Sequence, residues 1–392
     1  MSNSLWAIKA ARIYAPRAEW KPGIILVENQ TIKAVGTPDQ VEIPAGVEVI
    51  DVGEHIIAPG FIDIHIHGAM GHRVDDGTEA TLAIARYLPA QGTTAWLPTL
   101  LQPADIPAVV EAMSRQEDGA EVLGLNMEGP YLAPKQLPHE GDISTPVPSE
   151  AALLEYFSAA KGAIRLMSMA PELENAYAVI AAMRDLGIVP SVAHTKSGYA
   201  EFMRAVAAGA QHVTHAYNVM TGMHHRQPGT VGGVLTCDQV TAELIADGHH
   251  VHPVAMSVLI RCKGPQSVAL ITDSSRYQGL PDGDYGTHVK IGGIVRHKGY
   301  ETAVDHTLAG SVWPMNHNVA NVAELPHVTL VEAIEMATLT PARICGVAGR
   351  KGSIEPGKDA DLVVIDEKIN VQMTVVRGEI AYRAGSAGQQ GG

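Results

Sequence analysis

The chain contains few cysteines. Only three occur in its 392 residues, Cys237, Cys262 and Cys345, and they are widely separated with no C-x-x-C pair. An odd number of scattered cysteines argues against a disulfide framework and against a zinc site built from thiolates. We therefore expect free, buried thiols.

Long apolar runs and a surplus of basic residues are also missing. The apolar stretches are interrupted well short of the roughly 20 residues that span a bilayer. Lys9 and Arg12 close the short apolar stretch at the N-terminus, which does not resemble a secretory signal. The formal net charge of −14 would repel nucleic acid phosphates over most of the surface. We expect a cytoplasmic protein that binds neither membrane nor nucleic acid, although local cations or backbone N–H groups could still receive a small anion.

A metal-ligand pattern is present near the N-terminus. The apolar run 59–68 carries His65 and His67 one residue apart. In an extended strand, side chains at i and i+2 point to the same face, so the two imidazoles can reach one ion. Gly68 ends the run and leaves room beside the backbone. A lone His-x-His pair is common, and the interpretation depends on further ligands.

Further ligand-type residues follow other apolar, strand-like runs. Run 122–127 leads to Glu128, 188–193 to His194, 211–214 to His215, and 267–272 to Asp273. The carboxyl ends of successive parallel strands form the rim where α/β barrels build active sites. Single histidines such as His212 and His327 are typical of ordinary core or surface positions, and we assign them no role.

The order of predicted elements indicates two modules. Strand-like runs in the middle of the chain alternate with helical stretches at 78–91, 104–115, 150–161, 174–186, 199–208, 253–261, 316–324 and 330–337, as a parallel barrel requires. Short β-like runs occupy both ends, at 5–13, 24–28, 31–35 and 47–51 and again up to residue 383, with too few strands at either end for a stable sheet. We predict an α/β protein with a (β/α)8 TIM-type barrel over 56–345 and a small β-sandwich domain from 1–55 and 346–392. Gly292-Gly293 predicts a hairpin inserted near 285–304.

These motifs together resemble the N-acetylglucosamine-6-phosphate deacetylase family of the amidohydrolase superfamily. The resemblance covers nearly the whole chain and includes the segments 59–68, 128–130, 194–195, 214–220, 245–251, 272–273, 308–311 and 352–361. The stretch 220–229 is close to the branch for N-acetylgalactosamine 6-phosphate. The resemblance implies a metal-dependent hydrolase that converts an N-acetylhexosamine 6-phosphate, of either epimer, into the amino sugar 6-phosphate and acetate.

The resemblance also implies a metal centre. It places one divalent ion on His65 and His67 and another on His194 and His215, with Glu128 as the bridge. Some relatives lack the first pair and use one metal, so we expect one or two ions per subunit. Imidazole and carboxylate ligands suit zinc or iron(II). A bound metal would polarise the amide carbonyl and lower the pKa of its water toward about 7.

Catalytic and substrate roles are implied in the same way. Asp273 is the general base that accepts the proton of water and the acid that passes it to the departing amine. His139, in the place of the family's loop histidine, donates a hydrogen bond to the developing oxyanion. The implied substrate contacts are Asn218, the N–H of Val219, Arg226, His250 and, at the acetyl end, Leu308. In relatives the arginine can come from a neighbouring subunit, which implies a homodimer or higher homo-oligomer.

Three segments depart from the family pattern and keep alternatives open. They are the loop 137–140, Arg276 with Tyr277, and Trp313 with its neighbours. Because they can reshape the pocket, the sugar epimer and the need for phosphate stay undecided. One alternative is another amidohydrolase, acting on an N-acyl amino acid or a cyclic amide. The other is a non-catalytic scaffold barrel, which would have lost ligands or Asp273, whereas this chain has lost neither.

Overall fold

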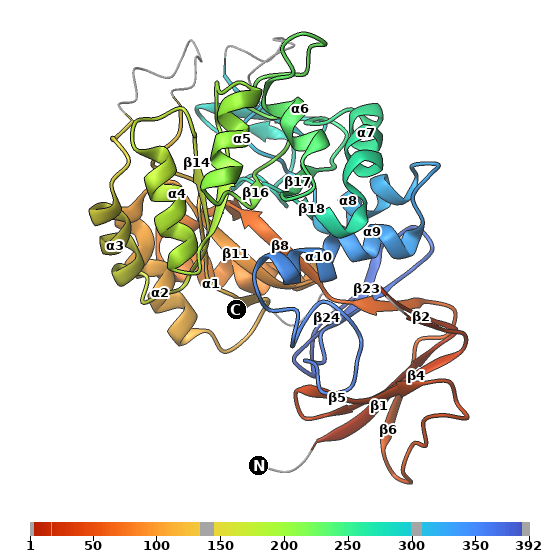
Figure 1. Ribbon diagram of the computed structural model, residues 1–392. Helices are drawn as coiled ribbons and strands as arrows, with labels where there is room; N and C mark the ends of the chain where they lie inside the picture. The colour runs from red at the N-terminus through yellow and green to blue at the C-terminus, as the bar shows by residue number, and fades with distance from the viewer. Residues whose placement is uncertain (1–3, 17, 134–144, 299–307, 386–392) are drawn as a thin grey trace.

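The computed structural model describes residues 4–16, 18–133, 145–298 and 308–385. The chain builds an α/β barrel and, beside it, a smaller part made of strands that contains the first strands of the chain (Figure 1). No helix within the described ranges has the length and apolar character to cross a membrane.

Eight parallel strands form the barrel. They are β8 (Phe61–Ile66), β11 (Thr93–Leu100), β13 (Leu125–Met127), β14 (Ile164–Met169), β15 (Val189–Val192), β16 (His212–Val213), β17 (Thr241–Ile245) and β18 (Val268–Ile271), with the short β12 (Glu121–Val122) beside β11. A parallel bridge between Ile66 and Ser274 brings the last strand back to the first. The fold class predicted from the sequence is confirmed.

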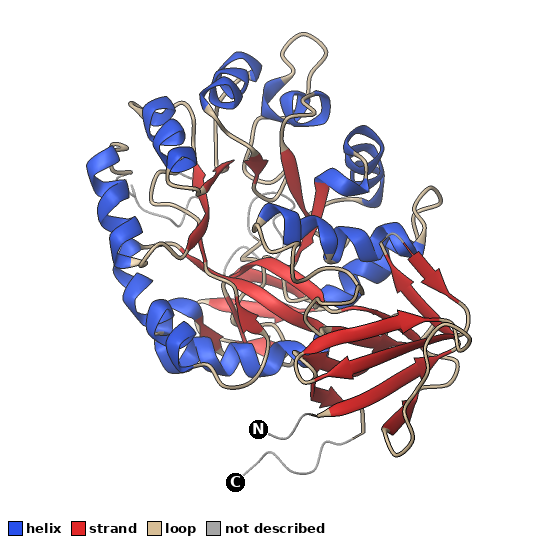
Figure 2. Cartoon of the chain, turned by 60° about the horizontal axis from the view of Figure 1, so that its bottom comes forward, coloured by secondary structure: helices blue, strands red, loops and turns tan. Residues whose placement is uncertain are grey.

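Helices surround the barrel (Figure 2). Within the described residues they are α1 (Thr78–Tyr87), α2 (Ile106–Arg115), α3 (Glu150–Ala159), α4 (Ala176–Asp185), α5 (Tyr199–Ala208), α6 (Gly229–Thr236), α7 (Pro253–Lys263), α8 (Met315–Ala323), α9 (Leu330–Ala337) and α10 (Leu339–Ile344). Short 3₁₀ helices lie at Val74–Asp76, Leu88–Gln91, Pro103–Asp105 and Pro265–Ser267. Because helices cover the outside and side chains fill the inside, every residue of β11 is buried.

The smaller part is a β-sandwich. One sheet has the order β5-β4-β1-β6 and the other β24-β23-β22-β7-β2-β3. Their bounds are β1 (Leu5–Ala10), β2 (Arg12–Ala15), β3 (Ala18–Trp20), β4 (Gly23–Glu28), β5 (Thr31–Gly36), β6 (Glu48–Asp51), β7 (Ile56–Pro59), β22 (Leu362–Ile365), β23 (Val371–Val376) and β24 (Glu379–Arg383). β7 pairs with β2 on one side and with β22 on the other, which joins the two ends of the chain. The division at residues 55 and 346 stays a prediction; β7, which starts at Ile56, pairs within this sheet.

An ion cluster connects the sandwich to the barrel. Lys351 is buried, and its Nζ lies 2.7 Å from Oε2 of Glu121 on β12 and 2.9 Å from Oδ2 of Asp359. It also pairs with Asp361, just before β22, and Arg350 pairs with Glu121 and Asp359. Burial would raise the pKa of Glu121, yet the hydrogen bond from Arg350 and the charge of Lys351 lower it to about 2. Glu121 therefore keeps its charge at neutral pH, and its ion pairs join β12 of the barrel to the segment that leads into β22.

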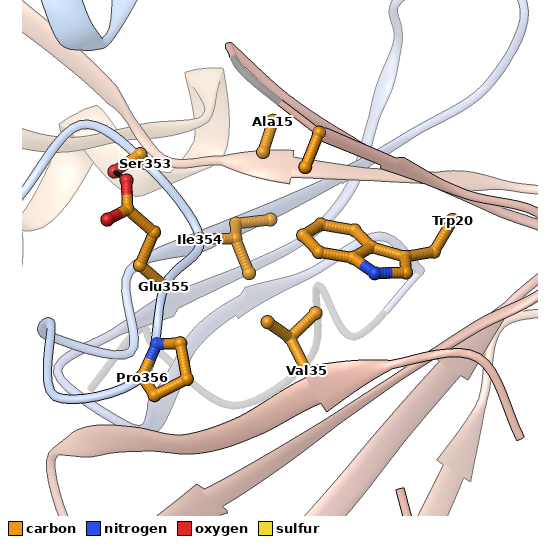
Figure 3. A pocket seen from close by; sticks show the side chains of 8 residues that line it. Ala15, Trp20, Val35, Ser353, Ile354, Glu355 and Pro356 are labelled. Atoms are coloured by element: carbon orange, nitrogen blue, oxygen red, sulfur yellow. Dashed lines mark hydrogen bonds between the residues drawn. The ribbon is translucent and has the colours of Figure 1, made fainter. Parts of the chain in front are cut away.

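The sandwich also contains an open cavity of about 390 Å³. Its lining residues come from the N-terminal strands and from the segment that precedes β22, namely Ala15, Ala18, Trp20, Val35, Ser353, Ile354, Glu355 and Pro356. The indole of Trp20 lies across from Ile354 and Val35 (Figure 3). None of these residues is a ligand-type residue singled out in the sequence, so the chemistry has to be sought at the barrel rim.

The inserted hairpin predicted near 285–304 is confirmed over its described part. β20 (His288–Ile291) pairs antiparallel with β21 (Ile294–His297), and β19 (Gly283–Asp284) pairs with β20. Gly292 and Gly293 make the turn with φ of 58° and 76°, a backbone region that glycine enters without strain. Val295 of the hairpin packs in a small cluster with Tyr277 and Val312. Two further short strands, β9 (Gly68–Ala69) and β10 (His72–Arg73), follow β8.

Candidate metal centre

The first histidine pair converges as the strand geometry predicts. His65 and His67 stand on β8 and at its carboxyl end, and their Nε2 atoms lie 3.3 Å apart. His65 is fully buried, whereas the side chain of His67 keeps 19% of its surface exposed. Solvent therefore reaches the pair through His67, at the carboxyl end of β8, and not through His65.

Glu128 lies between two histidine pairs. Its Oε2 is 2.9 Å from Nε2 of His67 and 3.6 Å from Nε2 of His65. Its Oε1 is 2.7 Å from Nε2 of His194 and 2.9 Å from Nε2 of His215. One carboxylate oxygen serves each pair, which is the arrangement that a bridging ligand needs.

The backbone is strained where it presents three of these residues. His194, His215 and Asp273 have φ of 41°, 30° and 50° just beyond β15, β16 and β18. Residues other than glycine rarely adopt this left-handed region, and such strain is concentrated at functional sites. Holding these three side chains in place therefore costs the protein some folding stability.

Asp273 stands beside the first histidine pair. Its Oδ1 lies 3.4 Å from Nε2 of His67 and 3.6 Å from Nε2 of His65. Its backbone N–H donates a hydrogen bond to the carbonyl oxygen of His65. Because the carboxylate is 15% exposed, it can reach both the histidines and a molecule that enters from the rim.

The donor set fits divalent metal. His65, His67 and Asp273 form one group of candidate ligand atoms that all lie within 4.8 Å of one another, and Glu128, His194 and His215 form a second. Burial disfavours the charged form of His67, yet hydrogen bonds to Asp273 and Glu128 raise its pKa to about 9. The carboxylates stabilise positive charge on the imidazole, so the site attracts cations. A bound metal ion would take the place of those protons.

Two carboxylates of the site were assigned no role from the sequence, although one of them, Asp247, lies in the family segment 245–251. Glu243 on β17 accepts hydrogen bonds from Nδ1 of His65, from Nε2 of His212 and from the backbone N–H of His215. Burial would raise the pKa of Glu243, but the charge of His65 and these hydrogen bonds lower it to about 2. A single charged residue within the otherwise mostly apolar run 240–246 is the sequence signal that marks Glu243.

Asp247 is the second. Its carboxylate accepts hydrogen bonds from the backbone N–H groups of His249 and His250, from Nδ1 of His250 at 2.7 Å, and from Oγ of Ser311 at 2.8 Å. Burial would raise the pKa of Asp247, but His250 lowers it to about 2. The carboxylate thereby fixes the ring of His250, a residue that the sequence analysis assigned to substrate.

The other predicted substrate contacts lie in two segments of the chain, just beyond β16 and beyond β21. The amide of Asn218 donates weak hydrogen bonds to the carbonyl oxygens of His215 and Ala216, and Val219 next to it is exposed. Leu308 bridges to Arg296 of β21. His139 lies outside the described residues.

Arg226 is not brought to the histidine cluster. It lies on an exposed loop, where its guanidinium contacts Nε2 of His225 at 2.7 Å. Its role as a contact to substrate phosphate, which in relatives can come from a neighbouring subunit, stays a prediction.

The residues that depart from the family pattern have defined places. Arg276 forms an ion pair with Asp76. Tyr277 packs against Tyr285, with ring centroids 5.2 Å apart. The indole of Trp313 stacks on His317 at 4.1 Å and on His249 at 6.0 Å. The backbone N–H of Trp313 donates to Oγ of Ser311, which donates to the carboxylate of Asp247.

A closed parallel barrel with two histidine pairs around one glutamate, at the carboxyl ends of its strands, is typical of metal-dependent barrel hydrolases. A family model described as the amidohydrolase family matches residues 56–381, and the chain belongs to that family.

Individual relatives are similar along most of their length. The chain is 36% identical over 350 residues to an N-acetylgalactosamine-6-phosphate deacetylase of Escherichia coli O157:H7, covering 86% of this chain and 91% of that protein. It is 35% identical to an N-acetylglucosamine-6-phosphate deacetylase of Bacillus subtilis (strain 168), covering 99% and 100%. A solved structure of a mutant N-acetyl-D-glucosamine-6-phosphate deacetylase from Mycobacterium smegmatis, in complex with N-acetyl-D-glucosamine 6-phosphate, superposes with a TM-score of 0.87 at 27% identity, covering 96% and 99%.

Proposed function

We propose that this protein is a metal-dependent hydrolase that removes the acetyl group from an N-acetylhexosamine 6-phosphate and releases the amino sugar 6-phosphate and acetate. The observation that carries the proposal is the position of Glu128, with one oxygen toward each histidine pair and Asp273 on the open side. The relatives at 35% and 36% identity support the substrate class.

The ligand set of the proposal is His65, His67, Glu128, His194 and His215. Two ions fit, because the two groups of ligand atoms are separate and Glu128 faces both. Imidazole and carboxylate donors suit zinc or iron(II), with zinc preferred. When bound, the metal would polarise the amide carbonyl and make water a better nucleophile at neutral pH.

Asp273 is the proposed proton carrier. Its carboxylate is ionised at neutral pH, because the charge of His65 and the hydrogen bond from His67 outweigh burial and lower its pKa. It can accept the proton of the attacking water and then deliver it to the amine nitrogen, which leaves far more readily when protonated. The histidines beside it hold the carboxylate in place between the two transfers.

The substrate contacts remain a proposal from the family pattern. Asn218, the N–H of Val219 and His250 would receive the sugar phosphate, Leu308 would line the acetyl end, and His139 would stabilise the oxyanion. Arg226 suits a phosphate that belongs to a neighbouring subunit's site, because it is exposed and its fork of donors matches phosphate oxygens. We therefore propose a homodimer or higher homo-oligomer, acting on a charged metabolite in the cytoplasm.

Acetate release is the test of this proposal. The purified chain is incubated with the 6-phosphates of N-acetylglucosamine and N-acetylgalactosamine, with the two unphosphorylated sugars, and with an N-acetyl amino acid. We expect turnover of at least one phosphorylated sugar and a large loss without phosphate. Silence with both phosphorylated sugars, together with turnover of the amino acid, would replace this proposal with a different amidohydrolase activity.

A further inference from the structure

Glu243 is a buried carboxylate that stands behind the proposed metal ligands. It lies inside the barrel on β17, with 0% of its surface exposed. Its Oε2 accepts a hydrogen bond from Nδ1 of His65 at 3.0 Å. The other ring nitrogen of that histidine faces away, with Nε2 at 3.3 Å from Nε2 of His67. His65 therefore connects Glu243 to the metal centre.

The contact decides which nitrogen of His65 carries the proton. A neutral imidazole has one N–H and one lone pair, and only the lone pair can bind metal. An ionised carboxylate accepts hydrogen bonds and donates none, so Glu243 keeps the proton on Nδ1 of His65. Nε2 is then left with its lone pair toward the site. A carboxylate in this place also makes the imidazole a stronger ligand.

The same carboxylate supports the second histidine pair. Oε2 of Glu243 accepts the backbone N–H of His215 at 3.0 Å, and the carbonyl oxygen of Glu243 accepts the N–H of Ala216. His215 is the ligand with a left-handed backbone at φ of 30°. β17 supplies no metal ligand, yet Glu243 on this strand holds both the ring of His65 and the strained backbone of His215.

His212 completes the arrangement. It is fully buried, its Nε2 lies 3.2 Å from Oε1 of Glu243, and its Nδ1 lies 2.6 Å from Oγ1 of Thr241. Both oxygens of Glu243 are therefore engaged, which keeps the carboxylate from turning. A buried charge is costly, and an apolar side chain of this size would fill the space at lower cost. The presence of a carboxylate at this position therefore indicates a role beyond packing.

We propose that Glu243 is a positioning residue that sets the tautomer of His65 and so secures the metal subsite formed by His65 and His67. This inference rests on the proposed function, since it takes His65 as a ligand. His212 acts through Glu243 by holding its second oxygen.

Zinc binding to two variants tests the inference. In Glu243→Leu the acceptor is gone, and in Glu243→Gln the shape stays while the charge is lost. The glutamine oxygen can still accept from His65, and its NH2 can donate to His212 in the other tautomer. We expect affinity at one of two zinc sites to fall about 10-fold in the glutamine variant and about 100-fold in the leucine variant, the range for such supporting carboxylates. Competition with a coloured chelator measures both sites without any substrate.

Two controls separate positioning from general damage. Ser168→Ala removes a buried polar group elsewhere in the barrel interior, a hydroxyl whose hydrogen-bond partner is Thr214. This variant should bind zinc like the wild type. In a His67→Asn background the first subsite is already lost, so adding Glu243→Leu should weaken zinc binding by much less than about 100-fold, because only the contact to the backbone N–H of His215 remains to be removed. A leucine variant that is folded by circular dichroism and binds two zinc ions with unchanged affinity would overturn the inference.

A measurement on the wild type covers the case in which the variants do not fold. With ¹⁵N-labelled histidine in the zinc-loaded protein, and the His65 signal identified by its loss in His65→Asn, the proton should sit on Nδ1. A proton on Nε2 of His65 would refute the positioning role. A wild-type chain that binds zinc and shows the expected tautomer, yet releases no acetate, would leave this inference standing and remove only the proposed substrate.

Discussion

The hydroxyl of Thr272 donates a hydrogen bond to Oδ2 of Asp63 across 2.6 Å, which ties the last barrel strand to the first. The two strands that it joins deliver Asp273 and the pair His65 and His67. Burial raises the pKa of Asp63 to about 7 although hydrogen bonds from Thr272 pull in the other direction. The closure of the barrel and the geometry of the site therefore depend on the same seam.

The first prediction concerns this seam. Thr272→Val keeps the shape of the side chain and removes the donor, so Asp63 loses its shortest hydrogen bond. We expect the free energy of unfolding to fall by about 1–3 kcal/mol, measured by urea denaturation of the metal-free protein at pH 7. Thr272→Ser, which keeps the hydroxyl, should stay closer to the wild type. Equal stability of the valine variant and the wild type would contradict this account of the barrel closure.

The second prediction concerns the ion cluster between barrel and sandwich. The pKa of Glu121 is about 2 in the folded chain and about 4.5 when unfolded, so its contribution is fully present above pH 4.5 and is lost as the pH falls toward 2. The contribution is on the order of 3 kcal/mol. Glu121→Gln should therefore be less stable than the wild type at pH 7, and the gap should shrink between pH 4.5 and 3. Chemical denaturation at several pH values measures the gap, and a gap that is constant over this range would exclude the linkage.

The third prediction concerns the proton carrier. Asp273→Asn keeps the size of the side chain but cannot accept the proton of water, so acetate release should fall by about 10²- to 10⁴-fold. Glu332→Gln, a change of the same kind at an exposed helix cap, is the control and should keep wild-type turnover. Metal content measured alongside separates a lost proton transfer from a lost ion. Turnover within 2-fold of the wild type in a metal-loaded Asp273→Asn variant would rule out the proposed role.

The fourth prediction concerns sugar selectivity. Trp313 stacks on His249 and His317, and its backbone N–H donates to Oγ of Ser311, which in turn donates to Asp247, the carboxylate that holds the ring of His250. Trp313→Ala should change the ratio of kcat/KM for the gluco and galacto 6-phosphates by about 10-fold, the size of effect that one apolar contact has on specificity. Trp20→Ala in the sandwich cavity is the matched control and should leave the ratio unchanged. Identical ratios in the wild type and Trp313→Ala would show that the indole does not contribute to selectivity.

Local sequence rules predicted much of the fold. The alternation of strands and helices, the hairpin at Gly292-Gly293 and the sandwich from both ends are confirmed. Some details were wrong. The run 5–13 is not one strand, because the chain breaks at Ala11, whose N–H bonds to Gly53, and continues in the other sheet. Helix α6 was missed because its three glycines disfavour a helix locally, and burial against α5 and α7 decides instead.

The residues of the candidate site were likewise predicted only in part. His65, His67, Glu128, His194, His215 and Asp273 were found because each lies at or just beyond the carboxyl end of a strand-like run, and the structure gathers them. Glu243 was not singled out, and Asp247 was recognised only as part of the segment 245–251, because their partners are set by which strands become neighbours in the barrel and by the loop after β17. The assignments of individual roles stay predictions.

Removal and return of the metal tests the central claim most directly. The wild type is dialysed against a chelator, its metal content is determined, and acetate release from the phosphorylated N-acetyl sugar is measured before and after zinc or iron(II) is added back. We predict that turnover disappears with the metal and returns as up to two ions per chain bind. Undiminished acetate release from a chain that holds no metal would contradict the account.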